Sequence, residues 1–382
     1  MKKYIRIIYL AGFLFTIPLA LTSYINSSLL EQYIHQDYVG LLYVSGSIVA
    51  ILGMLRMPNI LNRFGLRKSA IIFSSISFLS LIFLSFSKIA ILVVPAFLIY
   101  FIVNFFLTAI IDIFIEDLSS KHDIGTFRGL YLSLVSISWV LSQVISGSII
   151  AKSSFLGIYL FSGLFILLVL VLFITNLHNF VDLKYKKVAV KNTLIRVWKN
   201  KDILKIYLIN LNLRLFYSWM IIYMTLYLHE NIGFSFSEIG TIYAIMLTPF
   251  VFLSYPLGHL SDKMGEKKML IYGFVFITFA TLVIPFIESK TIWLFALVLF
   301  ISRIGAATIE VMSESYFFKN ITEEDVDEIA FFRNTGPMSF IIGPALATIS
   351  IIYIPDFSYI FFLLGVILLV GMLIAFRLRD IK

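Results

Sequence analysis

The sequence predicts an all-α membrane protein with twelve transmembrane helices in two pseudo-symmetric bundles of six. Of its 382 residues, 60% are hydrophobic and only 14% are charged, whereas a soluble protein of this length needs a mixed, charged exterior. Apolar runs of about 20 residues, the length that crosses a bilayer as a helix, recur along the chain. These runs are too long and too uniformly apolar for barrel strands, so helices remain as the spanning structure.

Twelve apolar segments separated by polar loops define the expected helices. The first follows a basic start, as a signal peptide would, but its length and the similar segments after it indicate a transmembrane helix. The segments cover residues 5–28, 38–57, 69–87, 89–115, 129–151, 154–177, 203–228, 237–257, 269–287, 291–316, 330–353 and 357–376.

Lysine and arginine residues gather on one side of this predicted membrane topology. That side holds both termini, the loops near residues 56–68 and 121–128, the central segment, and the loops near 263–268 and 319–333. The opposite side has only Lys88, Lys152 and Lys290. Because the basic side of a membrane protein faces the cytoplasm, we expect an integral protein of the cell (inner) membrane with both termini cytoplasmic.

The longest polar interruption covers residues 178–202 and is basic. It divides the chain into an N-terminal six-helix bundle, residues 1–177, and a C-terminal six-helix bundle, residues 203–382. We expect this linker at the cytoplasmic membrane surface, either as a solvated segment or attracted to anionic lipids.

The composition excludes several kinds of chemistry. The chain has no cysteine, which removes thiolate nucleophiles, disulfides and cysteine-bound metals. Its five histidines are not paired at metal-ligand spacing, and no glycine-rich phosphate loop followed by Lys-Ser/Thr occurs. The net charge of +8 follows from membrane topology rather than from nucleic-acid binding. We therefore expect no enzyme, no cofactor, no metal and no nucleic-acid partner.

The two halves contain corresponding motifs. The stretch "PNILNRFGLRK" at 58–68 aligns with "GHLSDKMGEKK" at 258–268 at an offset of 200, each after the second helix of its half. The stretch "IDIFIED" at 111–117 aligns with "IEVMSES" at 309–315 at an offset of 198. The chain therefore looks like a duplicated six-helix unit, as many secondary transporters are.

With these motifs the sequence resembles the major facilitator superfamily. The family's signature loop follows the second and eighth helices, and the second copy is complete here in Gly258, Asp262, Gly265, Lys267 and Lys268. The first copy departs from the pattern, with Pro58 for the glycine and Asn62 for the aspartate. The resemblance implies a transporter that works by alternating access, with rocking of the two halves about a site near the middle of the membrane.

The resemblance also implies a latch that closes the cytoplasmic gate. In this interpretation Asp262 pairs with basic groups and with a neighbouring helix N-terminus, where the dipole favours a negative charge. In the alternative interpretation, the basic residues only fix topology. The expected gate residues are Asn62, Gly65, Arg67, Lys68, Glu116, Asp117, Arg128, Gly258, Asp262, Gly265, Lys267, Lys268, Glu314 and Arg333.

Charges deep in the predicted helices indicate a binding cavity. A charge at mid-bilayer costs at least about 2.5–3.5 kcal/mol and therefore faces a cavity or a partner. Such charges fall in segments 89–115, 203–228 and 291–316, which are among the four that line the cavity in the family. The expected cavity residues are Asn26, Asn104, Asp112, Asn210, Arg214, Tyr217, Arg303 and Glu310.

Arg214 and Arg303 lie near the middle of their segments. A guanidinium presents a rigid fork of donors to a carboxylate or phosphate, which favours an anionic substrate. The two arginines could instead be neutralised inside the protein by Glu310 or Asp112. Glu310 is the first candidate for the proton-coupling group and Asp112 the second, because a carboxyl that alternates between an arginine and apolar surroundings takes up and releases a proton.

The leading prediction is thus a proton-coupled secondary transporter of a small solute, acting as a monomer in the lipid membrane. One alternative is a drug/proton antiporter of the same fold, although segment 129–151 lacks the proline of the antiporter pattern. A second alternative is a membrane sensor or assembly partner that does not transport.

Overall fold

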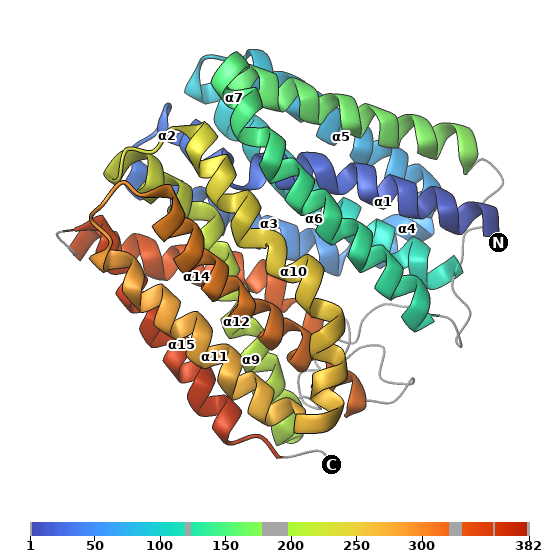
Figure 1. The fold of residues 1–382 in the computed structure, drawn as a ribbon. Coiled ribbons are helices and arrows are strands. Elements are labelled where there is room, and N and C mark those ends of the chain that lie inside the picture. The colour runs from blue at the N-terminus through green and yellow to red at the C-terminus, as the bar shows by residue number, and fades with distance from the viewer. Residues whose placement is uncertain (1, 119–123, 178–197, 321–330, 354–355, 380–382) are drawn as a thin grey trace. The chain divides into compact units, whose positions relative to one another are not determined.

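The computed structural model describes residues 2–118, 124–177, 198–320, 331–353 and 356–379, and these residues form helices joined by short connections, with no strand among them. The chain divides into two compact units (Figure 1). Unit 1 contains residues 1–187 and 235–240, and unit 2 contains residues 188–234 and 241–382.

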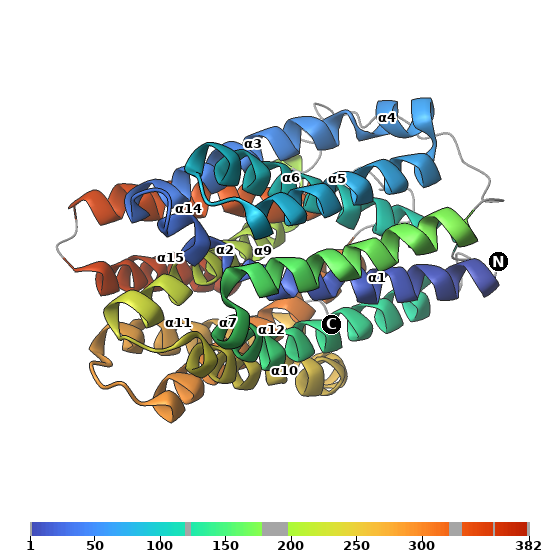
Figure 2. The same ribbon diagram turned by 90° about the horizontal axis from the view of Figure 1, so that it is seen from above.

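Unit 1 contains seven labelled helices among its described residues. They are α1 (Lys2–Ser23), α2 (Asn26–Glu31), α3 (Gln36–Leu55), α4 (Met57–Phe64), α5 (Leu66–Phe86), α6 (Ala90–Leu118) and α7 (Ile124–Asn176). Helix α1 packs along α7, which is visible in both ribbon views (Figures 1 and 2). Ile17, Leu21, Ile25, Ile150 and Ile158 form the buried apolar core of this contact.

Two predicted helices of unit 1 are joined in α7. Its chain path breaks at Ser154, where φ is 54° and ψ is −161°, which is the first residue of the predicted segment 154–177. A left-handed φ at a residue with a side chain is strained and marks a sharp change of direction. The sequence therefore located this break to within a few residues.

Unit 2 begins with α9 (Lys201–Trp219), which continues through two π-helical turns, η1 (Met220–Met224) and η2 (Tyr227–Asn231). The Oδ1 of Asn200 caps the start of α9 by accepting hydrogen bonds from the backbone N–H groups of Asp202 and Ile203. The other elements are α10 (Phe236–Met264), α11 (Glu266–Val283), η3 (Ile284–Phe286), α12 (Ile292–Lys319), α14 (Thr335–Tyr353), η4 (Phe357–Tyr359) and α15 (Ile360–Phe376). The first residues of α10 group with unit 1.

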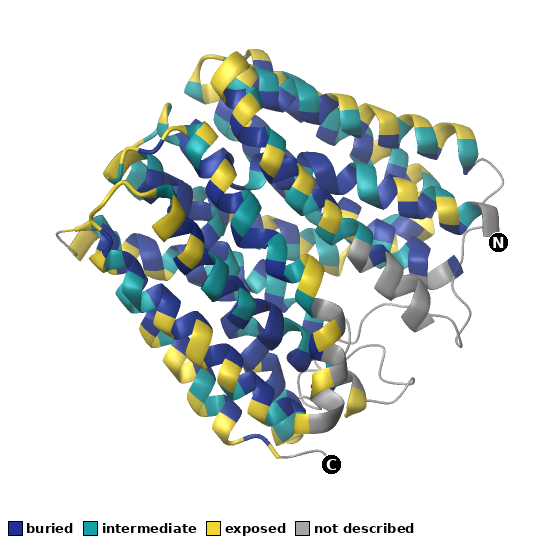
Figure 3. Cartoon of the chain, in the orientation of Figure 1, coloured by how far each residue is buried: buried dark blue, intermediate teal, exposed yellow. Residues whose placement is uncertain are grey.

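Exposed apolar side chains cover the outer faces of several helices. On α11, Tyr272, Val275, Phe276 and Phe279 are exposed, and yellow exposed positions alternate with buried ones along this helix (Figure 3). Ten of the described helices are long and apolar enough to cross a membrane. Because a bilayer tolerates such surface and water does not, the chain is an integral membrane protein.

The aligned loops of the two halves have the same backbone conformation. Gly65 has φ 83° and ψ 157°, and Gly265 has φ 82° and ψ 145°. Essentially only glycine adopts this combination of φ and ψ angles. Each glycine directly precedes a transmembrane helix, α5 or α11, which agrees with the alignment at an offset of 200.

We expect Gly265→Ala to destabilise the protein by about 1–3 kcal/mol, because a residue with a Cβ is strained in this backbone conformation. Steric contact does not contribute, since no other atom lies within 4 Å of a Cβ placed at this position. The measurement is the thermal unfolding midpoint of the detergent-solubilised protein. The matched control is Gly336→Ala in α14, where the added Cβ also meets nothing within 4 Å and φ is not positive. Equal midpoints for the two variants would contradict the prediction.

Candidate functional site

An ion pair joins α9 and α12 in unit 2. The Nη2 of Arg214 lies 3.0 Å from Oε1 of Glu310, and the hydroxyl of Tyr217 donates a 3.1 Å hydrogen bond to Oε2 of the same carboxylate. Arg214 and Tyr217 are three residues apart on α9 and therefore share a helix face. Both carboxylate oxygens of Glu310 thus have a partner. The side chain of Arg214 is 30% exposed and that of Glu310 is 27% exposed.

A second arginine, Arg303, lies on the other helix of this pair and contacts the same tyrosine ring. Arg303 of α12 is only 1% exposed, and its guanidinium carbon lies 4.8 Å from the ring centre of Phe216 and 5.6 Å from that of Tyr217. The guanidinium carbon of Arg214 lies 5.6 Å from the Tyr217 ring as well. A cation near an aromatic face is stabilised by about 0.5–2 kcal/mol, more when it is desolvated. Tyr217 therefore contacts both arginines.

The charges of this cluster are nearly balanced. Arg214 and Arg303 contribute two positive charges and Glu310 one negative charge, a sum of +1. Glu314, one turn further along α12, also acts on Arg214 electrostatically. Glu310 neutralises Arg214, as the second interpretation drawn from the sequence expects, whereas Arg303 packs against aromatic rings.

Asn210 has a structural role in unit 2. Its amide Nδ2 donates to Ser313 Oγ of α12 at 3.2 Å, and its Oδ1 accepts from Thr335 of α14 at 2.7 Å. All three side chains are buried. The sequence placed Asn210 in the cavity but gave no reason to connect it with Ser313 or Thr335. The contacts assign it to holding three helices together.

The expected cavity residues of unit 1 lie on α2 and α6. Asn26 begins α2, directly after the end of α1, and its Oδ1 accepts a 2.7 Å hydrogen bond from Tyr159 of α7. Asn104 is buried on α6, and within the described part of the chain its Oδ1 accepts no hydrogen bond. Asp112, two turns further along α6, is half-buried.

Buried tyrosines, which were not among the residues predicted from the sequence, surround the break between α1 and α2. The hydroxyl of Tyr100 lies 3.0 Å from Thr22 and donates to the carbonyl of Pro18 at 3.3 Å. The hydroxyl of Tyr43 lies 3.2 Å from Ser27. A buried tyrosine hydroxyl needs a polar partner, so a tyrosine in the middle of an apolar segment was the available signal.

The expected gate residues are only partly described. The side chains of Glu116, Asp117, Arg128 and Asp262, and the surroundings of Gly258, lie outside the described residues. Asn62, Lys68 and Lys268 are exposed, whereas Lys267, Glu314 and Arg333 are half-buried.

Arg67 has a definite position at the end of α7. Its Nη2 donates to the carbonyl of Ile174 at 2.8 Å and its Nε to that of Phe173 at 3.4 Å. The last carbonyls of a helix have no partner within the helix and carry a partial negative charge. Arg67 therefore caps α7 and ties it to α5.

The residue after Gly265 forms a polar contact that the motif did not predict. Glu266 is 2% exposed, and its Oε1 lies 2.5 Å from Nζ of Lys319 and accepts a 3.1 Å hydrogen bond from Ser315. Helices α11 and α12 are thereby joined at one end. The aligned position in the first half is the apolar Leu66, so only the second half has this carboxylate.

We expect Lys319→Met to lower the stability of the protein by about 1–3 kcal/mol, because it leaves the buried Glu266 carboxylate without its cation. The partly exposed position of Lys319, at 44%, favours the lower end of this range. Thermal unfolding in detergent measures the effect. Lys268→Met, at an exposed lysine, is the control, and a midpoint for Lys319→Met equal to that of the control would show that the contact contributes nothing.

The fold and this cluster define a class: an all-helical integral membrane protein with a charged, partly exposed site between transmembrane helices. Residues 206–382 match the family model of the Major Facilitator Superfamily. This confirms the resemblance in the C-terminal part of the chain, and the protein is a secondary active transporter of this class rather than an enzyme.

Solved structures extend the similarity of fold to the rest of the chain. A structure described as an auto-inhibited POT family peptide transporter has a TM-score of 0.77 and 10% sequence identity, and the match covers 99% of this chain and 98% of the other. The in meso structure of the POT family transporter PepTSo has the same TM-score and identity, with coverage of 99% and 97%. At this identity the likeness concerns the fold alone. No curated protein matches the sequence.

Proposed function

We propose that the protein is a proton-coupled transporter of a small solute that carries a carboxylate or another anionic group. The observation that supports this proposal most is the Arg214–Glu310 ion pair, in which both partners stay partly exposed and Tyr217 holds the second carboxylate oxygen. A structural ion pair needs no exposure, whereas a substrate must be able to reach the groups that bind it.

Glu310 couples the substrate to the proton in this proposal. An anionic substrate competes with Glu310 for the guanidinium of Arg214, and Glu310 accepts a proton when it loses that partner. Arg303, buried against Phe216 and Tyr217, keeps the surroundings positive and favours the bound anion. Release of the substrate restores the ion pair and expels the proton.

Unit 1 contributes neutral polar groups to the same function. The buried Oδ1 of Asn104 is an acceptor available to a substrate N–H or to water. Asn26 positions the Tyr159 hydroxyl, and Asp112 is the alternative proton carrier. In this proposal the two halves expected from the sequence, residues 1–177 and 203–382, move against each other in alternating access, with residues 178–202 as their linker.

A count of twelve transmembrane crossings fits the helices. To the ten apolar helices we add one crossing because α7 bends at Ser154 between two apolar stretches. We add another for α9 with η1 and η2, which runs from residue 201 to residue 231. An even number places both termini on the same, basic side, which we assign to the cytoplasm of the cell (inner) membrane.

The shared backbone conformation of Gly65 and Gly265 supports a gate on that side. Gly65 and Gly265 set the start of α5 and α11, and Arg67 and Glu266 fix neighbouring helix ends. In our proposal the remaining gate residues, Asp262 foremost, close the cytoplasmic side in one state of the transport cycle.

Peptides are a reasonable first substrate to test, because the similar structures are described as peptide transporters and every unmodified peptide carries a terminal carboxylate. The cluster of two arginines around Tyr217 favours such anions over the cationic substrates of drug/proton antiporters. A sensor or assembly partner without transport activity would carry no flux at all.

The test is uptake by the purified protein in proteoliposomes with an imposed pH gradient. Labelled dipeptides, organic acids, sugars and a cationic drug are compared in the same vesicles. We expect accumulation of a carboxylate-bearing solute that collapses when a protonophore removes the gradient. Accumulation of the cation alone would support the antiporter, and an absence of flux for every class in folded protein would support the sensor.

A further inference from the structure

A basic depression lies where α9 begins and the chain leaves α15. Lys199, Asn200, Lys201, Asp202 and Arg379 line it. Helix α15 is uniformly apolar and ends at Phe376, and α9 starts at Lys201. The depression therefore lies at the level where membrane helices meet water. Arg214 is 13 residues further along α9 than Lys201, about 20 Å along its axis, so this is a separate place from the Arg214–Glu310 cluster.

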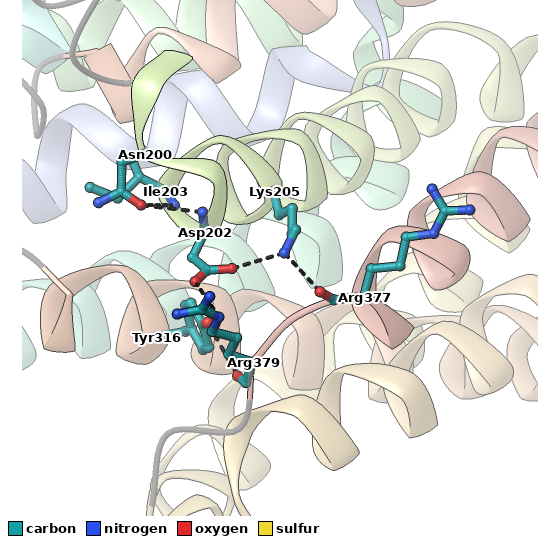
Figure 4. A network of polar contacts seen from close by, with 7 residues as sticks. All are labelled: Asn200, Asp202, Ile203, Lys205, Tyr316, Arg377 and Arg379. Carbon is teal, nitrogen blue, oxygen red and sulfur yellow. Dashed lines mark hydrogen bonds and ion pairs between the residues drawn. The ribbon is translucent and has the colours of Figure 1, made fainter.

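Polar contacts fix the shape of this depression (Figure 4). The Nζ of Lys205 lies 2.9 Å from Oδ1 of Asp202 and donates a 2.8 Å hydrogen bond to the carbonyl of Arg377. The Nε of Arg379 lies 3.7 Å from the other oxygen of Asp202. The hydroxyl of Tyr316, from α12, donates to the carbonyl of Arg379 at 3.2 Å. The end of the chain is thus held against α9 and α12.

The charge of the depression is positive. Its lining has three cations, Lys199, Lys201 and Arg379, and one anion, Asp202, which gives a net charge of +2. Asp202 is already engaged by Lys205. Neither Lys199 nor Lys201 forms an ion pair with any residue in the described ranges. The two lysines are therefore available to an external anion.

An exposed tryptophan adjoins these lysines. Trp198 is 73% exposed and directly precedes Lys199. Tryptophan side chains favour the headgroup level of a bilayer, where an apolar ring and a polar N–H are both accommodated. An exposed indole ring next to two lysines that form no ion pair in the described ranges favours a membrane lipid over a soluble anion as the occupant.

We propose that this depression binds the phosphate headgroup of an anionic phospholipid. Lys199 and Lys201 contact the phosphate, Arg379 bounds it from the end of the chain, and the Trp198 ring packs against the glycerol and upper acyl region. Basic pockets between transmembrane helices and clusters of juxtamembrane cations bind such headgroups. The lipid bridges the start of α9 and the C-terminal tail, and so holds together two segments far apart in the sequence.

The test is lipid binding to the full-length protein in neutral detergent, followed by native mass spectrometry. The probe is dioleoyl phosphatidylglycerol, and dioleoyl phosphatidylcholine is the zwitterionic comparison. We expect the wild-type protein to retain phosphatidylglycerol preferentially and to lose this preference at high ionic strength, which screens the contact. For Lys199→Gln/Lys201→Gln we expect about 10-fold or greater weakening, since each basic residue near an anionic surface contributes substantially.

The matched control is Lys88→Gln/Lys152→Gln, which removes the same two charges at exposed lysines elsewhere in the chain. Trp198→Ala should weaken the binding of phosphatidylglycerol without altering how that binding depends on ionic strength. Equal loss of lipid in the control, or equal retention of the two lipids by the wild type, would overturn the proposal. Inorganic phosphate is the third probe: displacement of phosphatidylglycerol by phosphate at equal concentration would show a free-anion site and also overturn it.

Discussion

Glu310→Gln should abolish accumulation driven by a pH gradient while substrate exchange between equilibrated compartments continues. Glutamine keeps the shape of the side chain and can accept the hydrogen bond of the Tyr217 hydroxyl, but it cannot ionise. The variant thus resembles the protonated transporter at all times. We expect the ratio of internal to external substrate to fall by about 5–150-fold, the usual range of a coupling factor between two sites.

The measurement compares gradient-driven uptake with counterflow in the same proteoliposomes. Glu288→Gln is the control, because Glu288 lies exposed in the connection before α12. Asp112→Asn tests the second carboxylate. If Glu310→Gln accumulates substrate as the wild type does, Glu310 is not the proton carrier. Loss of coupling in Asp112→Asn alone would assign that role to Asp112 in unit 1.

Arg214→Gln should weaken binding of an anionic substrate by about 30-fold. The loss of one partner from a hydrogen-bonded charge pair costs about 2–5 kcal/mol, and the partial exposure of this pair favours the low end. Binding should suffer more than the turnover of bound substrate, since the guanidinium is proposed to hold the substrate anion. Arg214→Lys should restore part of the affinity, because it returns the charge without the planar donor fork.

The KM for uptake and thermal stabilisation by substrate together measure this effect. Arg63→Gln removes an exposed arginine that lies 5.3 Å from the Phe64 ring and serves as the control. The double variant Arg214→Gln/Glu310→Gln completes a double-mutant cycle. Because the two side chains are in direct contact, we expect their effects to be non-additive. An unchanged KM in Arg214→Gln, or strict additivity, would remove this pair from the binding site.

Local patterns in the sequence predicted most of the helices. Hydropathy located the apolar segments, and the break at Ser154 falls at the first residue of one of them. The duplicated loop motif identified Gly65 and Gly265, which share one glycine-specific conformation. The polar stripe of α9 and the charges of α12 identified Arg214, Tyr217 and Glu310 as candidates, and these three side chains contact one another.

The roles of other residues depended on contacts between helices. Asn210 looked like a cavity residue, but Ser313 and Thr335 occupy its amide, and Thr335 lies 125 residues away in the chain. Glu266 stood inside a motif known for basic residues, and its partner Lys319 is 53 residues away. Arg67 looked like part of a latch and caps α7 at Ile174. No periodicity within one helix carries this information.

The sequence by itself determined that the chain lies in a membrane, which of its segments are apolar helices, and which few charged residues need a partner. These properties follow from transfer free energies and backbone hydrogen bonding, which depend on each segment alone. Only the tertiary structure decided that Arg214 pairs with Glu310 while Arg303 packs on the Phe216 and Tyr217 rings. The choice of partner depends on how two helices are rotated against each other, and side-chain packing across the whole unit sets that rotation.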